Sequence, residues 1–303
     1  MIKTKNLALK LAILYLVVFI SSCAKNTKDN SESFSFVFLT DIHLQPELNA
    51  TKGFKQAIDS INKYNPDFCI TGGDLIMDAL GQSYTRSDSL FNLYLETVKG
   101  ITSPVYNTMG NHDIYGIYTK SKADPSNPEY GEKMFENRIG KSYYSFEYKG
   151  WKFFVINSVE DTKKSRYIGL IDDQQIGWLK DELSKTDPKT PLVITTHIPF
   201  ITAFKQKYYG STLGNDSTLV VYNSKEVIDL FKGHNLKLVL QGHLHTIEDI
   251  YIDGVHFITG GSICGKWWNG ANMDFEEGFM YFTVNGENFD WKYIDYGWVA
   301  DSQ

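Results

Sequence analysis

Carboxylate, imidazole and amide side chains gather just after five short apolar runs of this sequence. They are, in chain order, Asp41 and His43, then Asp74, then Asn111, His112 and Asp113, then His197, and finally His243 and His245. Imidazole and carboxylate ligands without thiolate favour Zn, Fe, Mn or Ni over calcium or an iron–sulfur cluster. One catalytic ion takes about three protein ligands, so the set predicts two ions roughly 3.5–4 Å apart that share one carboxylate.

The elements that must position these groups are predicted to be short strands that alternate with helices. Five runs rich in β-branched and aromatic residues are too short for helices: 34–39, 68–71, 104–108, 192–196 and 236–240. Helical spacing of apolar residues covers 54–64, 87–99, 173–184 and 224–231. Hairpins are predicted for 143–148 with 151–157 and for 279–284 with 288–294. The pattern predicts one α/β domain with antiparallel strands towards the C-terminus, and a site at the carboxyl ends of the strands.

Taken in order, the motifs resemble those of the calcineurin-like metallophosphoesterases. The motifs are Asp41-X-His43, Gly73-Asp74, Gly110-Asn111-His112-Asp113, His197 and Gly242-His243-X-His245. The resemblance implies a four-layer αββα sandwich, with two mixed β-sheets face to face and helices outside. It also implies two metal ions (Fe, Mn or Zn). One would be bound by Asp41, His43, Asp74 and His245, and the other by Asp74, Asn111, His197 and His243, so that Asp74 bridges them.

The activity that the resemblance implies is hydrolysis of a phosphomonoester or phosphodiester. Two dications lower the pKa of a bridging water, and the resulting hydroxide attacks phosphorus in line with the leaving oxygen. His112 is expected near that oxygen as an acid or electrostatic stabiliser, with Asp113 holding its tautomer and orientation. Two alternatives stay open: a cyclic-nucleotide phosphodiesterase of the same family, and a non-catalytic metal-binding lipoprotein, although the complete set of motifs disfavours the latter.

The first 22 residues are typical of a secretion signal rather than of the fold. Three lysines precede an apolar run at 11–20, which is shorter than the roughly 20 residues that a spanning helix needs. The following Ser21-Ser22-Cys23 resembles the lipobox of bacterial lipoproteins, and an ordinary signal peptide is the alternative. The sequence therefore predicts a signal peptide (1–22), a lipid on Cys23 that holds the protein at the bacterial envelope membrane, a polar tether (23–33) and a catalytic domain (34–303).

Composition excludes several other classes of protein. The chain has 303 residues, of which 42% are apolar and 22% charged, and it has only three cysteines. These values argue against a disordered chain and against a small disulfide-stabilised scaffold. A net charge of −6 argues against a nucleic-acid binder, which needs a basic surface. The partner that the resemblance implies is a small-molecule or lipid-headgroup phosphoester, and the acidic charge argues against nucleic acid as a substrate.

The roles of four further residues stay open in the sequence. A glycine-rich stretch at 260–270 carries Trp267 and Trp268, which could stack on a substrate or pack in the core. Cys69 and Cys264 could form a disulfide in an exported protein. A pair of buried thiols is favoured because Cys69 lies inside an apolar strand.

Overall fold

The computed structural model describes residues 33–300, which lie in one compact unit. The predicted signal peptide, the lipid attachment at Cys23 and the tether as far as residue 32 lie outside the described residues. Within residues 33–300, no helix has the length and apolar character needed to cross a bilayer.

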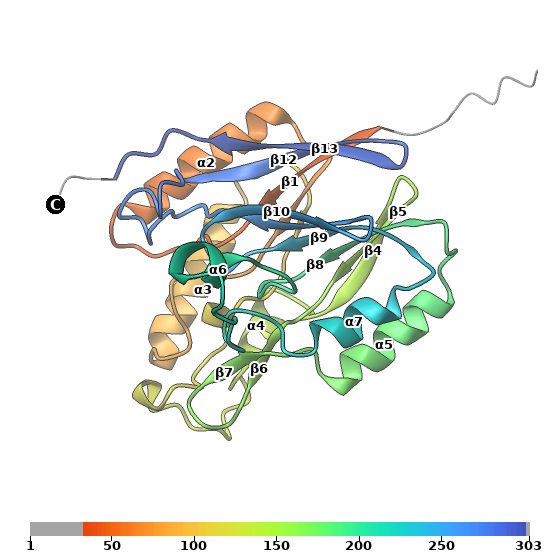
Figure 1. The fold of residues 1–303 in the computed structure, drawn as a ribbon. Helices are drawn as coiled ribbons and strands as arrows, with labels where there is room; N and C mark the ends of the chain where they lie inside the picture. Colours follow the sequence, from red (N-terminus) through yellow and green to blue (C-terminus); the bar gives the residue numbers. More distant parts are fainter. Residues whose placement is uncertain (1–32, 301–303) are drawn as a thin grey trace, which may run out of the picture. The chain divides into compact units, whose positions relative to one another are not determined.

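Two mixed β-sheets form the centre of the fold (Figure 1). The first sheet has the order β13 (Asn288–Asp295), β12 (Gly278–Asn285), β1 (Phe34–Leu39), β2 (Phe68–Thr71) and β3 (Val105–Tyr106). The second has the order β10 (Ile247–Ile252), β11 (Val255–Gly260), β9 (Asn235–Gln241), β8 (Pro191–Thr195), β5 (Trp151–Val155) and β4 (Tyr144–Tyr148). A separate small hairpin pairs β6 (Val159–Asp161) with β7 (Tyr167–Gly169).

Helices cover the outer faces of the sheets and complete the four layers. The first sheet carries α2 (Ala50–Tyr64) and α3 (Tyr84–Val98), and the second carries α5 (Asp173–Ser184) and α7 (Ser224–Leu230) (Figure 1). Shorter helices lie in the connections: η1 (Asn111–Asp113), η2 (Thr119–Ser121), α4 (Lys133–Arg138) and α6 (Phe204–Tyr209). The predicted αββα sandwich is confirmed, as are its antiparallel C-terminal strands β12 and β13.

The core between the two sheets is rich in aromatic rings. Phe34, Phe36 and Phe38 alternate along β1, so all three point to the same face of the sheet. The Phe36 ring lies 5.8 Å from that of Phe153 on β5, and the Phe68 ring of β2 lies 5.4 Å from the same ring. These contacts hold the two sheets together. They therefore also fix the positions of the strand ends that carry the candidate ligands.

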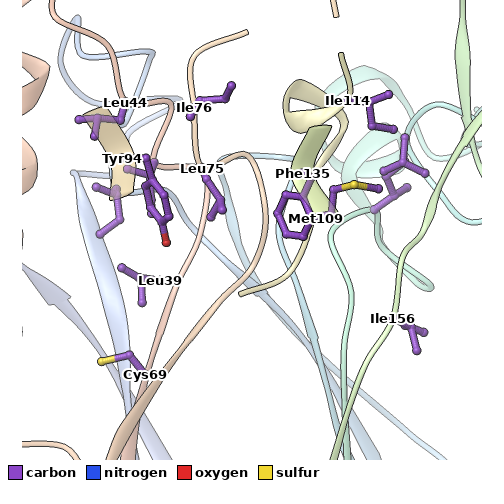
Figure 2. Close-up of a cluster of buried hydrophobic side chains, with 14 of the residues drawn as sticks. Leu39, Leu44, Cys69, Leu75, Ile76, Tyr94, Met109, Ile114, Phe135 and Ile156 are labelled. Atoms are coloured by element: carbon purple, nitrogen blue, oxygen red, sulfur yellow. The ribbon is translucent and has the colours of Figure 1, made fainter. Parts of the chain in front are cut away.

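A second apolar cluster lies between the sheets and the outer helices. Figure 2 shows part of it, including Leu39, Leu75 and Met109. Leu75 adjoins Asp74 in the chain, while Leu39 and Met109 stand two residues before Asp41 and Asn111. All three apolar side chains are fully buried, so core packing fixes the ends of the loops that bear site residues.

Both cysteines in the described chain are buried and free. The interpretation of Cys69 and Cys264 as buried thiols is confirmed, and a disulfide between them is absent. Burial raises the pKa of the Cys69 thiol to about 12, so this group stays protonated and behaves as a small apolar side chain.

Candidate metal centre

The predicted ligands meet where the carboxyl ends of strands from both sheets come together. In the first sheet β1 and β2 run parallel, and in the second β8 and β9 do. The loops after them are joined across the sheets, because the backbone N–H of His243 donates to both carboxylate oxygens of Asp41, at 3.1 and 2.9 Å. Six of the seven predicted ligands are buried and His243 is half-buried: Asp41, His43, Asp74, Asn111, His197 and His245.

The first group of donors is built around two facing imidazoles. His43 Nε2 lies 3.1 Å from His245 Nε2 and 3.4 Å from Asp74 Oδ2. His245 Nε2 lies 3.3 Å from Asp41 Oδ1. These are the four residues expected to bind one ion.

The second group adjoins the first through Asp74. His197 Nε2 lies 3.2 Å from Asp74 Oδ2 and 2.9 Å from Asn111 Oδ1. His243 joins this group, since one ligand atom each from Asp74, His197 and His243 lie within 4.8 Å of one another. The structure therefore brings together all seven residues of the predicted set, with Asp74 in contact with both groups.

Backbone carbonyls select which ring nitrogen of three histidines faces the centre. The Nδ1–H of His197 donates to the carbonyl of Gly72 at 2.7 Å, and that of His245 to Gly265 at 2.7 Å. His243 uses Nε2–H instead, towards the carbonyl of Thr218 at 2.9 Å. The other nitrogen of each ring keeps its lone pair for a metal ion.

The donor set fits two cations. His43 Nε2 lies 3.1 Å from His245 Nε2 and 3.4 Å from Asp74 Oδ2, and His245 Nε2 lies 3.3 Å from Asp41 Oδ1, so potential ligand atoms converge as they do around a cation. Five of the predicted ligands also have left-handed backbone angles, which non-glycine residues seldom adopt. Their φ angles lie between 44° and 73°, for Asp41, His43, Asp74, His243 and His245. Such backbone strain is concentrated at functional sites.

The charge state of the site suits cation binding. Burial and the charge of His197 lower the pKa of His243 to about 4, and burial lowers the pKa of His43 well below its ordinary value. Burial by itself would raise the pKa of Asp74, but the neighbouring imidazoles, His197 foremost, hold it well below its usual range. Burial lowers the pKa of His197, but Asp74 outweighs this effect and raises it to about 9, so a bound cation would displace that proton.

Two glycines allow the loops to approach this closely. A Cβ on Gly242 would lie 2.2 Å from Thr40 Oγ1 and 2.9 Å from Asp41 Oδ2. Gly73 has a φ of +92°, and a Cβ there would lie 2.6 Å from Nδ1 of His197. A side chain at either position would therefore displace a ligand.

His112 lies beside the donor groups, but Asp113 does not contact its ring. The His112 ring is 4.7 Å from that of His43, and its Nδ1–H donates to the carbonyl of Met77 at 2.6 Å. The expectation that Asp113 orients His112 is wrong. Asp113 accepts hydrogen bonds from three backbone N–H groups, those of Leu75, Ile76 and Gly110. It therefore positions the two loops that carry Asp74 and Asn111, because a buried carboxylate can satisfy several backbone donors at once.

The two tryptophans of the glycine-rich loop have different surroundings. Trp268 is buried, and its Nε1–H donates to the carbonyls of Ile42 and His43 at 3.1 and 3.0 Å. Trp267 is 39% exposed and its ring lies 4.9 Å from that of His245. Trp268 is thus a core residue that supports the His43 loop, and Trp267 lies at the rim of the site.

Trp268→Phe is expected to lower the free energy of unfolding by about 1–3 kcal/mol, because two buried carbonyls of the His43 loop lose their donor. Metal affinity should fall as well, since that loop carries a ligand. Denaturant unfolding and zinc titration would measure both effects. Trp178→Phe, which shortens a ring packed on Phe154 of the second sheet, controls for ring size. Equal losses in the two variants would contradict a special role for the Trp268 hydrogen bonds.

Sequence reasoning missed several groups that support the site. Cys264 Sγ lies 3.9 Å from His245 Nδ1, and the carbonyls of Gly265 and Thr218 accept from ligand histidines. The glycine-rich stretch marked the first two, but a backbone carbonyl leaves no signal in the sequence. Only the folded loops reveal these contacts.

Comparison with known proteins agrees with this geometry. Residues 34–246 match a family model described as calcineurin-like phosphoesterase. A Fibrobacter succinogenes protein named a probable cyclic nucleotide phosphodiesterase is 24% identical over 263 residues, 85% of each chain. A solved dimetal phosphatase from Danio rerio has a TM-score of 0.56 at 14% identity and covers 87% of this chain and 99% of its own. GAP50 of Plasmodium, described as the anchor in the inner membrane complex, has a TM-score of 0.54 at 18% identity and covers 87% and 85%. These two structures show the shared fold.

Proposed function

Because the chain belongs to the calcineurin-like phosphoesterases and is a metal-dependent phosphoester hydrolase, we propose that it works through two metal ions that share Asp74. One observation carries the proposal. A single oxygen, Oδ2 of Asp74, lies 3.4 Å from Nε2 of His43 and 3.2 Å from Nε2 of His197, one donor from each group. An oxygen placed between two sets of ligands is the arrangement that two neighbouring ions require.

The residues of the chain divide the chemical work. When bound, the two cations would supply Lewis-acid activation of water and neutralise charge on the phosphoryl oxygens. His112 serves the leaving oxygen: its Nδ1–H donates to the carbonyl of Met77, so the doubly protonated ring gives its Nε2 proton to that oxygen as the P–O bond breaks and keeps the one on Nδ1. Asp74 fixes the position of this residue, because Oδ1 accepts from the His112 backbone N–H at 2.8 Å.

We propose a phosphodiester as the substrate. The Fibrobacter relative is named for cleavage of such a bond. The two cationic side chains that line the cavity beside His112 already face carboxylates: Arg86 at 2.6 Å from Glu47, and Lys120 at 3.7 Å from Asp78. A monoanionic diester needs less additional positive charge than a dianionic monoester. Cyclic nucleotides are one class of such diesters.

Turnover assays with the purified protein test this proposal. After loading with Mn, Zn or Fe, bis-p-nitrophenyl phosphate and a 3′,5′-cyclic nucleotide are expected to be cleaved faster than p-nitrophenyl phosphate, and chelation should abolish turnover. Faster cleavage of the monoester would overturn the diester assignment. If no phosphoester is cleaved although two metals per chain are measured, the protein is a non-catalytic metal-binding protein instead.

We also propose that the protein is exported and held at the envelope membrane by a lipid on Cys23. The apolar run at 11–20 and the Ser21-Ser22-Cys23 sequence support this proposal. Cys23→Ser is expected to abolish labelling by radioactive palmitate and to move the protein out of the membrane fraction. Cys69→Ala, which alters a buried thiol, should keep the label. Unlabelled wild-type protein in the soluble fraction would instead indicate an ordinary signal peptide.

A further inference from the structure

A cavity of about 480 Å³ opens beside the metal centre, and of the predicted ligands only Asn111 lines it. Asn111 and His112 belong to its lining. The leaving oxygen must come within hydrogen-bond reach of His112 for a proton to be transferred. The rest of the leaving group then extends into the cavity that this side chain lines. Its volume suits a sugar or a nucleoside, since ligand pockets of roughly 300–1,000 Å³ hold molecules of that size.

The polar part of the cavity wall is centred on Asp78. Oδ2 of this carboxylate accepts a hydrogen bond from Gln82 Nε2 at 3.2 Å and lies 3.7 Å from Lys120 Nζ. The Asp78 side chain is only 14% exposed, whereas that of Lys120 is 64% exposed. Tyr118, which also lines the cavity, is close enough that burial and the charge of Asp78 raise the pKa of its phenol.

The Lys120 side chain is 64% exposed, and one side of its stem follows the chain at Gly81. Its aliphatic stem lies against Gly81, where an added Cβ would come 1.7 Å from Lys120 Cε. The backbone of this segment is fixed as well, because the N–H of Tyr118 donates to the carbonyl of Leu80 at 2.8 Å. The glycine therefore permits a lysine to lie along the cavity wall.

The chemistry of this wall selects one kind of leaving group. An apolar group would leave the Asp78 carboxylate without water or a new partner, which is costly for a largely buried charge. An anionic group would be repelled by the same carboxylate. A hydroxyl group donates to a carboxylate and accepts from an amide or ammonium at the same time, so adjacent hydroxyls satisfy Asp78, Gln82 and Lys120 together.

On the basis of the phosphoesterase function proposed above, we infer that the leaving group of the substrate is polyhydroxylated, as in a ribose, another sugar or a polyol, and that Asp78 and Lys120 bind its hydroxyls. Asp78 is thereby the residue that sets specificity. The metal ligands and His112 act on the phosphoryl group whatever alcohol leaves.

Matched pairs of phosphoesters test the inference on the metal-loaded protein. Bis(2,3-dihydroxypropyl) phosphate is compared with dipropyl phosphate, and 3′,5′-cyclic AMP with its 2′-deoxy analogue, by kcat/KM and by calorimetric binding. The hydroxylated member of each pair is expected to be preferred by about 10- to 100-fold, the range for hydrogen bonds to a charged group. Equal values within both pairs, in turnover and in binding, would overturn the inference.

Variants assign the preference to this wall. Asp78→Asn and Lys120→Met are expected to lower the preference about tenfold, and Gly81→Ala should lower it by displacing the Lys120 stem with every charge kept. Lys122→Met, two residues away and outside the cavity lining, should leave it unchanged. A preference that survives all three cavity variants would contradict the assignment.

If bis-p-nitrophenyl phosphate is hydrolysed but the pairs are not distinguished, the inference fails and the proposed function stands. If no phosphoester is hydrolysed, the proposed function fails, and the calorimetric comparison still decides the inference.

Discussion

Asp74→Asn is expected to remove at least one of the two metal ions and to lower kcat/KM by about 1,000-fold or more. The variant keeps the shape of the side chain but replaces the one oxygen that contacts both donor groups with part of a neutral amide. Metal centres stabilise the transition-state charge by several kcal/mol, and each 1.4 kcal/mol corresponds to a tenfold change in rate. Metal content by mass spectrometry and turnover of bis-p-nitrophenyl phosphate measure the two effects.

Asp249→Asn provides the matched control. Asp249 lies on β10 beside a histidine, with its Oδ1 2.9 Å from His256 Nδ1, but it belongs to neither donor group. This variant should keep two metals and full activity. If Asp74→Asn also kept two metals with wild-type affinity, Asp74 would not be the shared ligand and the proposed two-metal arrangement would be wrong.

His112→Ala is expected to lower kcat by about 100- to 10,000-fold, the usual range for loss of a positioned acid or base, while both metals stay bound. The ring is fixed by the carbonyl of Met77 at 2.6 Å and lies beside the ligand His43 without belonging to the predicted ligand set. The loss should be smaller for substrates with a good leaving group such as p-nitrophenolate, because that oxygen needs less protonation. Comparison of p-nitrophenyl and alkyl esters therefore separates a proton-transfer role from a structural one.

His256→Ala serves as the control for this substitution, because His256 lies on β11 and pairs with Asp249 away from the metal centre. It should leave kcat and metal content unchanged. Loss of a metal ion in His112→Ala would instead show that His112 is a ligand. This alternative is specific, because ligand atoms of His112, His43 and Asp74 lie within 4.8 Å of one another. An equal loss for both kinds of ester would also contradict the role as an acid.

The main elements of the fold were predictable wherever burial enforces a clear pattern. The strands β1 and β2 have the predicted bounds because both are buried runs of apolar residues. The hairpin of β10 and β11 was missed, because β10 is an edge strand with exposed Tyr251 and Ile252. An edge strand with few buried side chains lacks the alternation by which strands are recognised. The run at 104–108 is reduced to the two residues of β3, since pairing with β2 extends only over Val105 and Tyr106.

The sequence by itself determined which residue types stand at the strand ends and in which order. These motifs carried the family resemblance that implied the sandwich and the seven candidate ligands. Only the tertiary structure decided which atoms face one another. Asp41 and His243 are 202 positions apart in the chain, and their contact depends on two sheets packed through aromatic rings. The hydrogen bonds of Asp113 to three backbone donors and the cavity around Asp78 arise in the same way. Such contacts are set by loops with left-handed residues and by close packing, and neither follows from the local periodicity of a sequence.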